Sequence, residues 1–110
     1  MDIHEDRSAD LVVLTLSGRL DGTTTQTFEE KILGVIDGGA HRLVVDLAQL
    51  EYVSSAGLRV FLHAAKRIQR HKGKLALCSL AVHVQQVFDL SGFSSILAIY
   101  GSRPEAVDRL

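Results

Sequence analysis

The fold is decided by one stretch near the middle of the chain, which reads Asp46-Leu47-Ala48-Gln49-Leu50-Glu51-Tyr52-Val53-Ser54-Ser55-Ala56-Gly57-Leu58. Its first residues complete an apolar run over residues 43–47, of the length and composition typical of a strand buried on both faces of a sheet. A short connection leads from this strand to two consecutive serines, and the serines begin an amphipathic helix. The stretch therefore predicts a buried strand, a connection and a helix start in close succession.

The helix that begins at the serines carries an apolar stripe. Five apolar side chains recur at helical spacing, namely Leu58, Phe61, Leu62, Ala65 and Ile68. Gly73 is expected to end the helix. Lysines and arginines crowd residues 66–74, and because no aromatic residue lies among them they are more typical of a solvated helix end than of an RNA-binding surface.

Strands and helices alternate along the rest of the chain. The predicted strands span residues 3–7 (weakly), 11–16 (ending at Ser17-Gly18), 43–47, 75–78 and 96–100. The predicted helices run from a Thr23–Gln26 capping box to Gly38-Gly39, from Ser54 to Gly73, over 82–90, and over 103–110 with Pro104 near the first position. This order predicts an α/β fold with right-handed crossovers and a largely parallel sheet, which an N-terminal hairpin makes mixed.

Composition and charge narrow the class of protein. With 110 residues, 46% of them hydrophobic and 23% charged, the chain is expected to form a single globular domain over residues 1–110. It has no apolar run long enough to cross a membrane and no signal-peptide pattern, so we expect a cytoplasmic protein without membrane insertion. A net charge of -1 argues against a direct nucleic-acid partner. The one cysteine, Cys78, lies in an apolar run and is expected to be a buried thiol.

Most catalytic signatures are absent from the sequence. There is no phosphate-binding loop of the G-x-x-x-x-G-K-[ST] type and no G-x-G-x-x-G, and the five histidines are scattered. We therefore expect no cofactor and no metal site. A small hydrolase that uses Ser55 as its nucleophile is one alternative, but Val53 stands where a nucleophile elbow needs glycine. The sequence favours a binding protein over an enzyme.

The start of a helix requires one capping serine, but this chain has two in succession, Ser54 and Ser55. Serine is a favoured N-cap, and one helix needs one N-cap. If Ser54 caps, Ser55 lies in the first helical turn with its hydroxyl free. A phosphate on that oxygen would add about -1.5 to -2 charges beside the positive end of the helix dipole, where anions are tolerated. The pair therefore predicts a site that changes binding without unfolding the domain.

Two motifs carry a resemblance to a known family. The turn Gly18-Arg19-Leu20-Asp21 and the run Tyr52-Val53-Ser54-Ser55-Ala56-Gly57-Leu58 resemble the STAS domain of bacterial anti-sigma factor antagonists, over roughly residues 8–100. The resemblance implies a four- or five-stranded mixed sheet flanked by about four helices. It also implies partner switching, in which the unphosphorylated domain binds an anti-sigma factor that is itself a serine kinase of the GHKL type. That kinase phosphorylates the domain and thereby releases it, and a serine phosphatase resets the cycle.

The same resemblance assigns residues. Ser55 matches the phosphoacceptor, and the expected partner-binding residues are Asp21, Ser54, Ser55, Gly57 and Leu58. Gly57 is expected to face the partner, so that Gly57→Ala would keep the fold and weaken binding. The family usually has Asp where this chain has Ser54, which keeps a hydrogen bond but loses a charge. Ser54 is therefore a rival acceptor, and the alternative function is a constitutive STAS subunit of a lipid-transport or stressosome-type assembly.

Overall fold

The computed structural model describes residues 1–110 and contains one five-stranded sheet in the order β1-β2-β3-β4-β5. The strands are β1 (Asp2–Ser8), β2 (Leu11–Leu20), β3 (Arg42–Val53), β4 (Lys74–Cys78) and β5 (Ala98–Tyr100). The helices are α1 (Thr25–Asp37), α2 (Ser55–Arg70), α3 (Val82–Leu90) and α4 (Arg103–Arg109), with a 3₁₀ turn, η1, at Phe93–Ser95. None of these helices combines the length and the apolar character needed to cross a bilayer.

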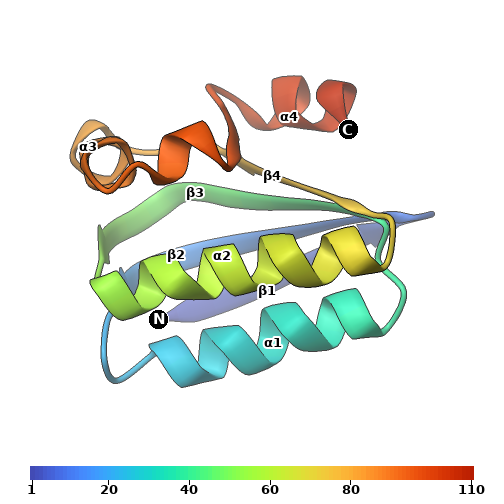
Figure 1. The fold of residues 1–110 in the computed structure, drawn as a ribbon, viewed down its shortest axis with the longest axis horizontal. Helices are drawn as coiled ribbons and strands as arrows, with labels where there is room; N and C mark the ends of the chain where they lie inside the picture. Colours follow the sequence, from blue (N-terminus) through green and yellow to red (C-terminus); the bar gives the residue numbers. More distant parts are fainter.

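The sheet is mixed in the way that the element order predicts. β1 pairs antiparallel with β2, while β2, β3, β4 and β5 all pair in parallel. Parallel neighbours need crossover connections, and α1, α2 and α3 supply them. The α/β fold with a five-stranded mixed sheet and four α-helices is confirmed (Figure 1).

Three helices share the larger core on one face of the sheet. Each contributes one fully buried phenylalanine, Phe28 from α1, Phe61 from α2 and Phe88 from α3. The ring of Phe61 lies 5.2 Å from that of Phe28 and 5.5 Å from that of Phe88, both tilted, which is a favourable arrangement of aromatic quadrupoles. This row of rings fixes α2 between its two neighbours.

Helix α4 covers part of the opposite face. A smaller cluster there combines Ala106 of α4 with Val13, Val44, Ala76 and Cys78 of the sheet. Arg103 at the start of α4 donates from Nε to Asp46 Oδ2 at 3.0 Å and from Nη2 to Thr15 Oγ1 at 2.9 Å. Because Asp46 is only 8% exposed, this pairing supplies a charged partner to a carboxylate that otherwise accepts only the Ala48 amide.

Three strand boundaries differ from the predictions. β2 does not end at Ser17-Gly18 but continues to Leu20, because Gly18 adopts a positive φ of 99° within an irregularity of the β2–β3 register. β3 runs to Val53, so the predicted connection before the serines is itself strand. The last strand begins at Ala98 and not at 96, because the Ile96 and Leu97 amides bond back to the Phe93 carbonyl.

The predicted capping box is also wrong. α1 begins at Thr25 with Thr24 as its N-cap residue, and no side chain caps it. Thr23, expected to pair with Gln26, instead donates its amide and its hydroxyl to Asp21 Oδ1 at 3.0 and 2.8 Å. The Asp21 carboxylate is a stronger acceptor for Thr23 than the Gln26 side-chain amide. The helix therefore has Thr24 as its N-cap residue, one residue later than the motif suggests.

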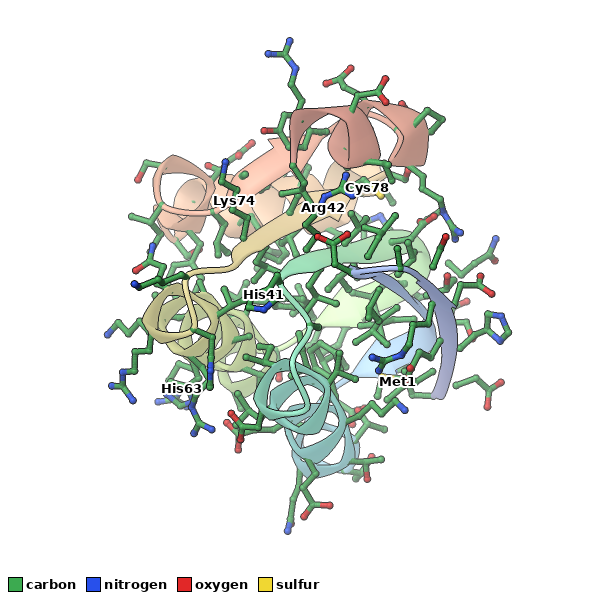
Figure 2. All side chains as sticks on the ribbon, turned by 90° about the vertical axis from the view of Figure 1, so that its right-hand side faces the viewer. Met1, His41, Arg42, His63, Lys74 and Cys78 are labelled. Atoms are coloured by element: carbon green, nitrogen blue, oxygen red, sulfur yellow. The ribbon has the colours of Figure 1, made fainter.

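Cys78 is expected to react slowly with thiol reagents in the folded protein. It is fully buried at the end of β4, where the smaller cluster lies under α4 (Figure 2). Burial raises the pKa of the Cys78 thiol, and the neighbouring carboxylate of Asp46 acts in the same direction. Labelling at mildly alkaline pH, with and without denaturant, measures this, and rapid labelling of the native chain would contradict it.

Replacing Arg103 should weaken the packing of α4 against the sheet and expose Cys78 more often. Arg103→Ala leaves Asp46 without its charged partner, and we expect a loss of about 1–3 kcal/mol in unfolding free energy and faster labelling of Cys78. Arg109→Ala is the matched control, because Arg109 is an exposed residue of the same helix with no ion-pair partner. Equal labelling rates in the two variants would show that the Arg103 contacts do not hold α4 in place.

Candidate functional site

Strands β2 and β3 end side by side, and this brings two distant loops together. Leu20 and Val53 are the last residues paired between the strands. Asp21 and Ser54 follow directly, one leading to α1 and the other to α2 (the left-hand end of Figure 1). The Ser54 amide donates to the Leu20 carbonyl at 2.9 Å, which ties the two ends together. We call the surface formed by residues 19–24 and 51–55 the carboxyl edge.

The two serines at this edge have different roles. Ser54 is the N-cap of α2, and its Oγ accepts a hydrogen bond from the Gly57 amide at 3.1 Å. Ser55 is the first helical residue, is exposed, and its hydroxyl makes no hydrogen bond within the chain. The predicted division between a capping serine and a free serine is confirmed. The Ser55 hydroxyl also lies in the first turn, where backbone N–H groups lack intrahelical partners and attract anions.

Asp21 organises the neighbouring loop. Its carboxylate accepts two hydrogen bonds from Thr23, while its amide donates to Thr24 Oγ1 at 3.0 Å. The side-chain and backbone hydrogen bonds from Thr23 hold the pKa of Asp21 below its ordinary value, and the Arg19 guanidinium, 3.6 Å away, adds to the effect. Asp21 therefore stays ionised and helps to shape the loop beside the serines.

Two further residues at this edge were not among the predicted partner-binding residues. Arg19 and Tyr52 face each other in the β2–β3 register, and the Arg19 guanidinium lies 4.3 Å from the centre of the Tyr52 ring. Tyr52 keeps 40% of its surface exposed. Both residues lie in the two motifs quoted above, but their contact arises only from the register between two strands that are far apart in the chain.

The predicted placement of Gly57 and Leu58 on the partner-binding surface needs a correction. Both are buried, Leu58 at 6% exposure, so they lie beneath the carboxyl edge and do not face a partner. A Cβ atom on Gly57 would lie 2.8 Å from Leu20 Cγ and 3.1 Å from Val53 Cγ2. The close approach that glycine permits is therefore to the chain's own core, so these contacts predict a loss of stability in Gly57→Ala, while its predicted effect on partner binding stays a prediction.

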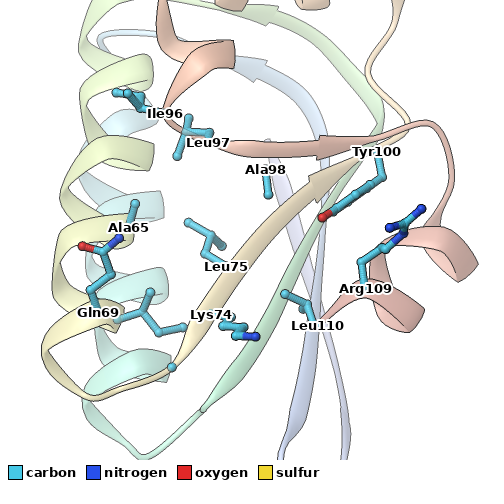
Figure 3. A pocket seen from close by; sticks show the side chains of 12 residues that line it. Ala65, Gln69, Lys74, Leu75, Ile96, Leu97, Ala98, Tyr100, Arg109 and Leu110 are labelled. Atoms are coloured by element: carbon cyan, nitrogen blue, oxygen red, sulfur yellow. The ribbon is translucent and has the colours of Figure 1, made fainter.

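The largest cavity lies away from the serines. It has a volume of about 350 Å³ and lies between the later part of α2, the β4–β5 edge and the end of the chain (Figure 3). Leu75, Ala98 and Tyr100 are among its lining residues. None of the cavities found is lined by residues of the carboxyl edge.

Comparison with known proteins places this geometry in a family. A family model described as the STAS domain matches residues 2–106. BtrV of Bordetella bronchiseptica, named as a candidate anti-sigma factor antagonist, is 38% identical over 106 residues, covering 96% of this chain and 91% of that protein. The anti-sigma F factor antagonist of Paenibacillus polymyxa is 27% identical over 111 residues, covering all of this chain and 95% of its own.

A solved structure shares the fold. The anti-sigma factor antagonist SpoIIAA in its unphosphorylated form superposes with a TM-score of 0.85 at 24% identity, covering 98% of this chain and 95% of its own. SpoIIAA of Bacillus has also been solved in a phosphorylated form, with a TM-score of 0.76 at 22% identity and 98% of each chain covered. At these identities the likeness concerns the fold alone.

Gly57→Ala should destabilise the chain. Alanine favours a helix over glycine by about 0.5–1 kcal/mol, but forcing a methyl group against buried Leu20 costs about 1–3 kcal/mol. We expect the second effect to dominate, with a net loss of roughly 1 kcal/mol or more. Gly34→Ala in α1 is the matched control, since nothing lies within 4 Å of its added Cβ, and it should stabilise. Denaturant unfolding measures both, and a Gly57→Ala chain as stable as wild type would contradict the contacts described.

Asp21 should make the stability of the fold depend on acid pH. A carboxylate with a lowered folded-state pKa stabilises the fold above its unfolded pKa and loses this contribution as pH falls through the folded pKa. Asp21→Asn should therefore unfold more readily than wild type at pH 7, and the difference should shrink in acid. Urea midpoints at neutral and acid pH measure it, and a difference independent of pH would rule out an ionised Asp21 as the cause.

Proposed function

Because the chain belongs to the STAS domain family, we propose that it is an anti-sigma factor antagonist whose binding is switched by phosphate on Ser55. The unphosphorylated chain binds an anti-sigma factor that is also a serine kinase of the GHKL type. The kinase transfers phosphate to Ser55 and the complex dissociates. A serine phosphatase removes the phosphate and restores binding. Asp21 and Ser54 flank Ser55 in the partner-binding surface.

The free hydroxyl of Ser55 is the observation that carries this proposal. Of the two serines, Ser54 is half-buried and its Oγ already accepts the Gly57 amide. Ser55 is exposed, has no hydrogen-bond partner in the chain, and stands at the end of the helix where added negative charge is stabilised. A kinase can therefore reach Ser55 without breaking a contact of the folded chain. The N-cap role of Ser54 argues against it as the rival acceptor.

Charge explains how the modification would act on binding alone. A phosphate at Ser55 adds about -1.5 to -2 charges beside Asp21, which already carries one. The fold loses no contact, but a partner that fits a neutral hydroxyl must now accommodate a desolvated dianion. The same surface would bind tightly in one state and weakly in the other.

The geometry favours binding over catalysis at this serine. A serine nucleophile is activated by an adjacent base, and no histidine or carboxylate is hydrogen-bonded to Ser55. The nearest histidine along α2, His63, pairs instead with Glu29 of α1 at 2.9 Å. The relatives named above are regulators by name, in keeping with a role without chemistry of its own.

Phosphate mapping tests the proposal. We expect incubation with the cognate kinase and ATP to add one phosphate to wild type, located on Ser55 by mass spectrometry of the peptides. Ser55→Ala should remain unmodified. Ser54→Ala removes the N-cap and should lower the unfolding free energy by about 1 kcal/mol while phosphate still appears on Ser55.

Each other outcome has a distinct meaning. Phosphate on Ser54 would overturn the assignment of the acceptor. An unmodified wild-type chain in the presence of an active cognate kinase would overturn the switch and favour a constitutive STAS subunit. Covalent capture of Ser55 by a serine-reactive hydrolase probe would contradict the binding role.

A further inference from the structure

Helix α2 exposes a face without a single acidic residue. Its sixteen residues, Ser55–Arg70, contain no Asp or Glu. The exposed residues of the helix are Ser55, Arg59, His63, Lys66, Gln69 and Arg70. Four of them, Arg59, His63, Lys66 and Arg70, follow each other at spacings of four, three and four residues, which places them in one row along the helix. We call these four residues the basic stripe.

Most of the basic stripe is not neutralised by the rest of the chain. His63 pairs with Glu29, and the adjacent Arg67 pairs with Asp37 at 2.7 Å, both on α1. Arg59, Lys66 and Arg70 have no ion-pair partner in the chain. Between His63, Lys66, Arg67 and Arg70 lies a hollow of about 160 Å³ that only these four side chains line (Figure 2 shows His63 on the outer side of α2).

This arrangement is costly for an ordinary solvated helix. Stable exposed helices mix both charges, because Glu–Lys pairs four residues apart stabilise while like charges at that spacing destabilise. Lys66 and Arg70 are like charges four residues apart. The helix dipole favours cations only in its last turn, so it accounts for Arg70 but not for Arg59. Folding alone does not explain the composition of the stripe.

We propose that the basic stripe binds an acidic segment of the chain's protein partner, continuing the contact that begins at Ser55. The proposal rests on the proposed function for the identity of that partner and adds the surface that holds it. From Arg59 to Arg70 the stripe spans about 16 Å at 1.5 Å per residue, the length of three helical turns or of about five extended residues. A partner helix or strand with three or four carboxylates on one face matches it.

Other polyanions fit this surface less well. The chain as a whole carries a charge of -1, so a nucleic acid would be repelled by the remaining surface, and the stripe holds no aromatic side chain to stack on bases. The stripe also holds no exposed apolar side chain that could enter a lipid bilayer. An acidic protein segment requires only the cations that are present.

The stripe also begins close to the switch. Arg59 is four residues after Ser55, the spacing at which two side chains on a helix meet. A phosphate on Ser55 can therefore pair with Arg59 and withdraw it from the partner's carboxylates. In this account the modification both repels the partner at Ser55 and removes one cation from the stripe.

Charge reversal with a matched control tests the proposal. Lys66→Glu/Arg70→Glu reverses the far end of the stripe, about 16 to 22 Å along the helix from Ser55. Lys74→Glu/Arg109→Glu produces the same change in net charge at exposed residues outside it. We expect the first variant to bind the cognate anti-sigma factor at least about tenfold more weakly and the control to bind within about twofold of wild type. Raising the salt from about 50 to 300 mM should weaken wild type more than the reversed variant.

The outcomes separate this proposal from the function on which it rests. If wild type fails to bind the anti-sigma factor, the proposed function is overturned. If wild type binds and both variants bind equally, the function stands and the stripe proposal is overturned. Circular dichroism of both variants checks that α2 remains folded.

A second experiment tests the basic stripe without the natural partner. Amide shifts of the labelled chain are followed by NMR on titration with a twelve-residue glutamate peptide, a DNA duplex of twelve base pairs, or phosphatidylglycerol vesicles. We expect the peptide to perturb α2 around Lys66 and Arg70, and the DNA and vesicles to bind more weakly. Stronger binding of DNA or vesicles at α2, or no perturbation of α2 by the peptide, would overturn the acidic-segment proposal.

Discussion

The close approach of helix α2 to the ends of β2 and β3 is the constraint on which the candidate site depends. Leu20 and Val53 close the β2–β3 pairing, and Gly57 lies against both because it has no side chain. The Ser54 amide bonds to the Leu20 carbonyl, and the Ser54 hydroxyl then caps the helix. With the strand ends, the cap and the first turn held together in this way, Ser55 is the first residue of the helix and is exposed to solvent.

The two faces of α2 differ in what they contact. The inward face carries Leu58, Phe61 and Ile68, and the row of three phenylalanine rings locks the helix to α1 and α3. The outward face carries a free hydroxyl followed by cations. Because the inward contacts do not involve the outward side chains, charge on the outward face can change without loss of the core. This independence is what a switch in binding without unfolding requires.

Much of this was predictable from the sequence, and the failures have physical causes. The helical spacing of Leu58, Phe61 and Ile68 predicts α2 correctly, and one helix needing one cap predicts the division between Ser54 and Ser55. The inward placement of Gly57 was missed, because helical position alone does not say which strand ends lie beneath a glycine. The capping box failed because Asp21 competes for Thr23. The Arg19–Tyr52 contact depends on an irregular strand register that no local pattern contains.

We infer that the charge state of Ser55 sets the affinity of the folded chain for its partner. Titration calorimetry of the anti-sigma factor with the unmodified chain, and with the same chain carrying one phosphate on Ser55, measures it most directly. We expect an affinity at least about tenfold lower for the phosphorylated chain, equivalent to about 1.4 kcal/mol, with its thermal unfolding essentially unchanged. Equal affinities for the two forms, or a phosphorylated chain that has lost its cooperative unfolding, would show that Ser55 is not a switch of binding alone.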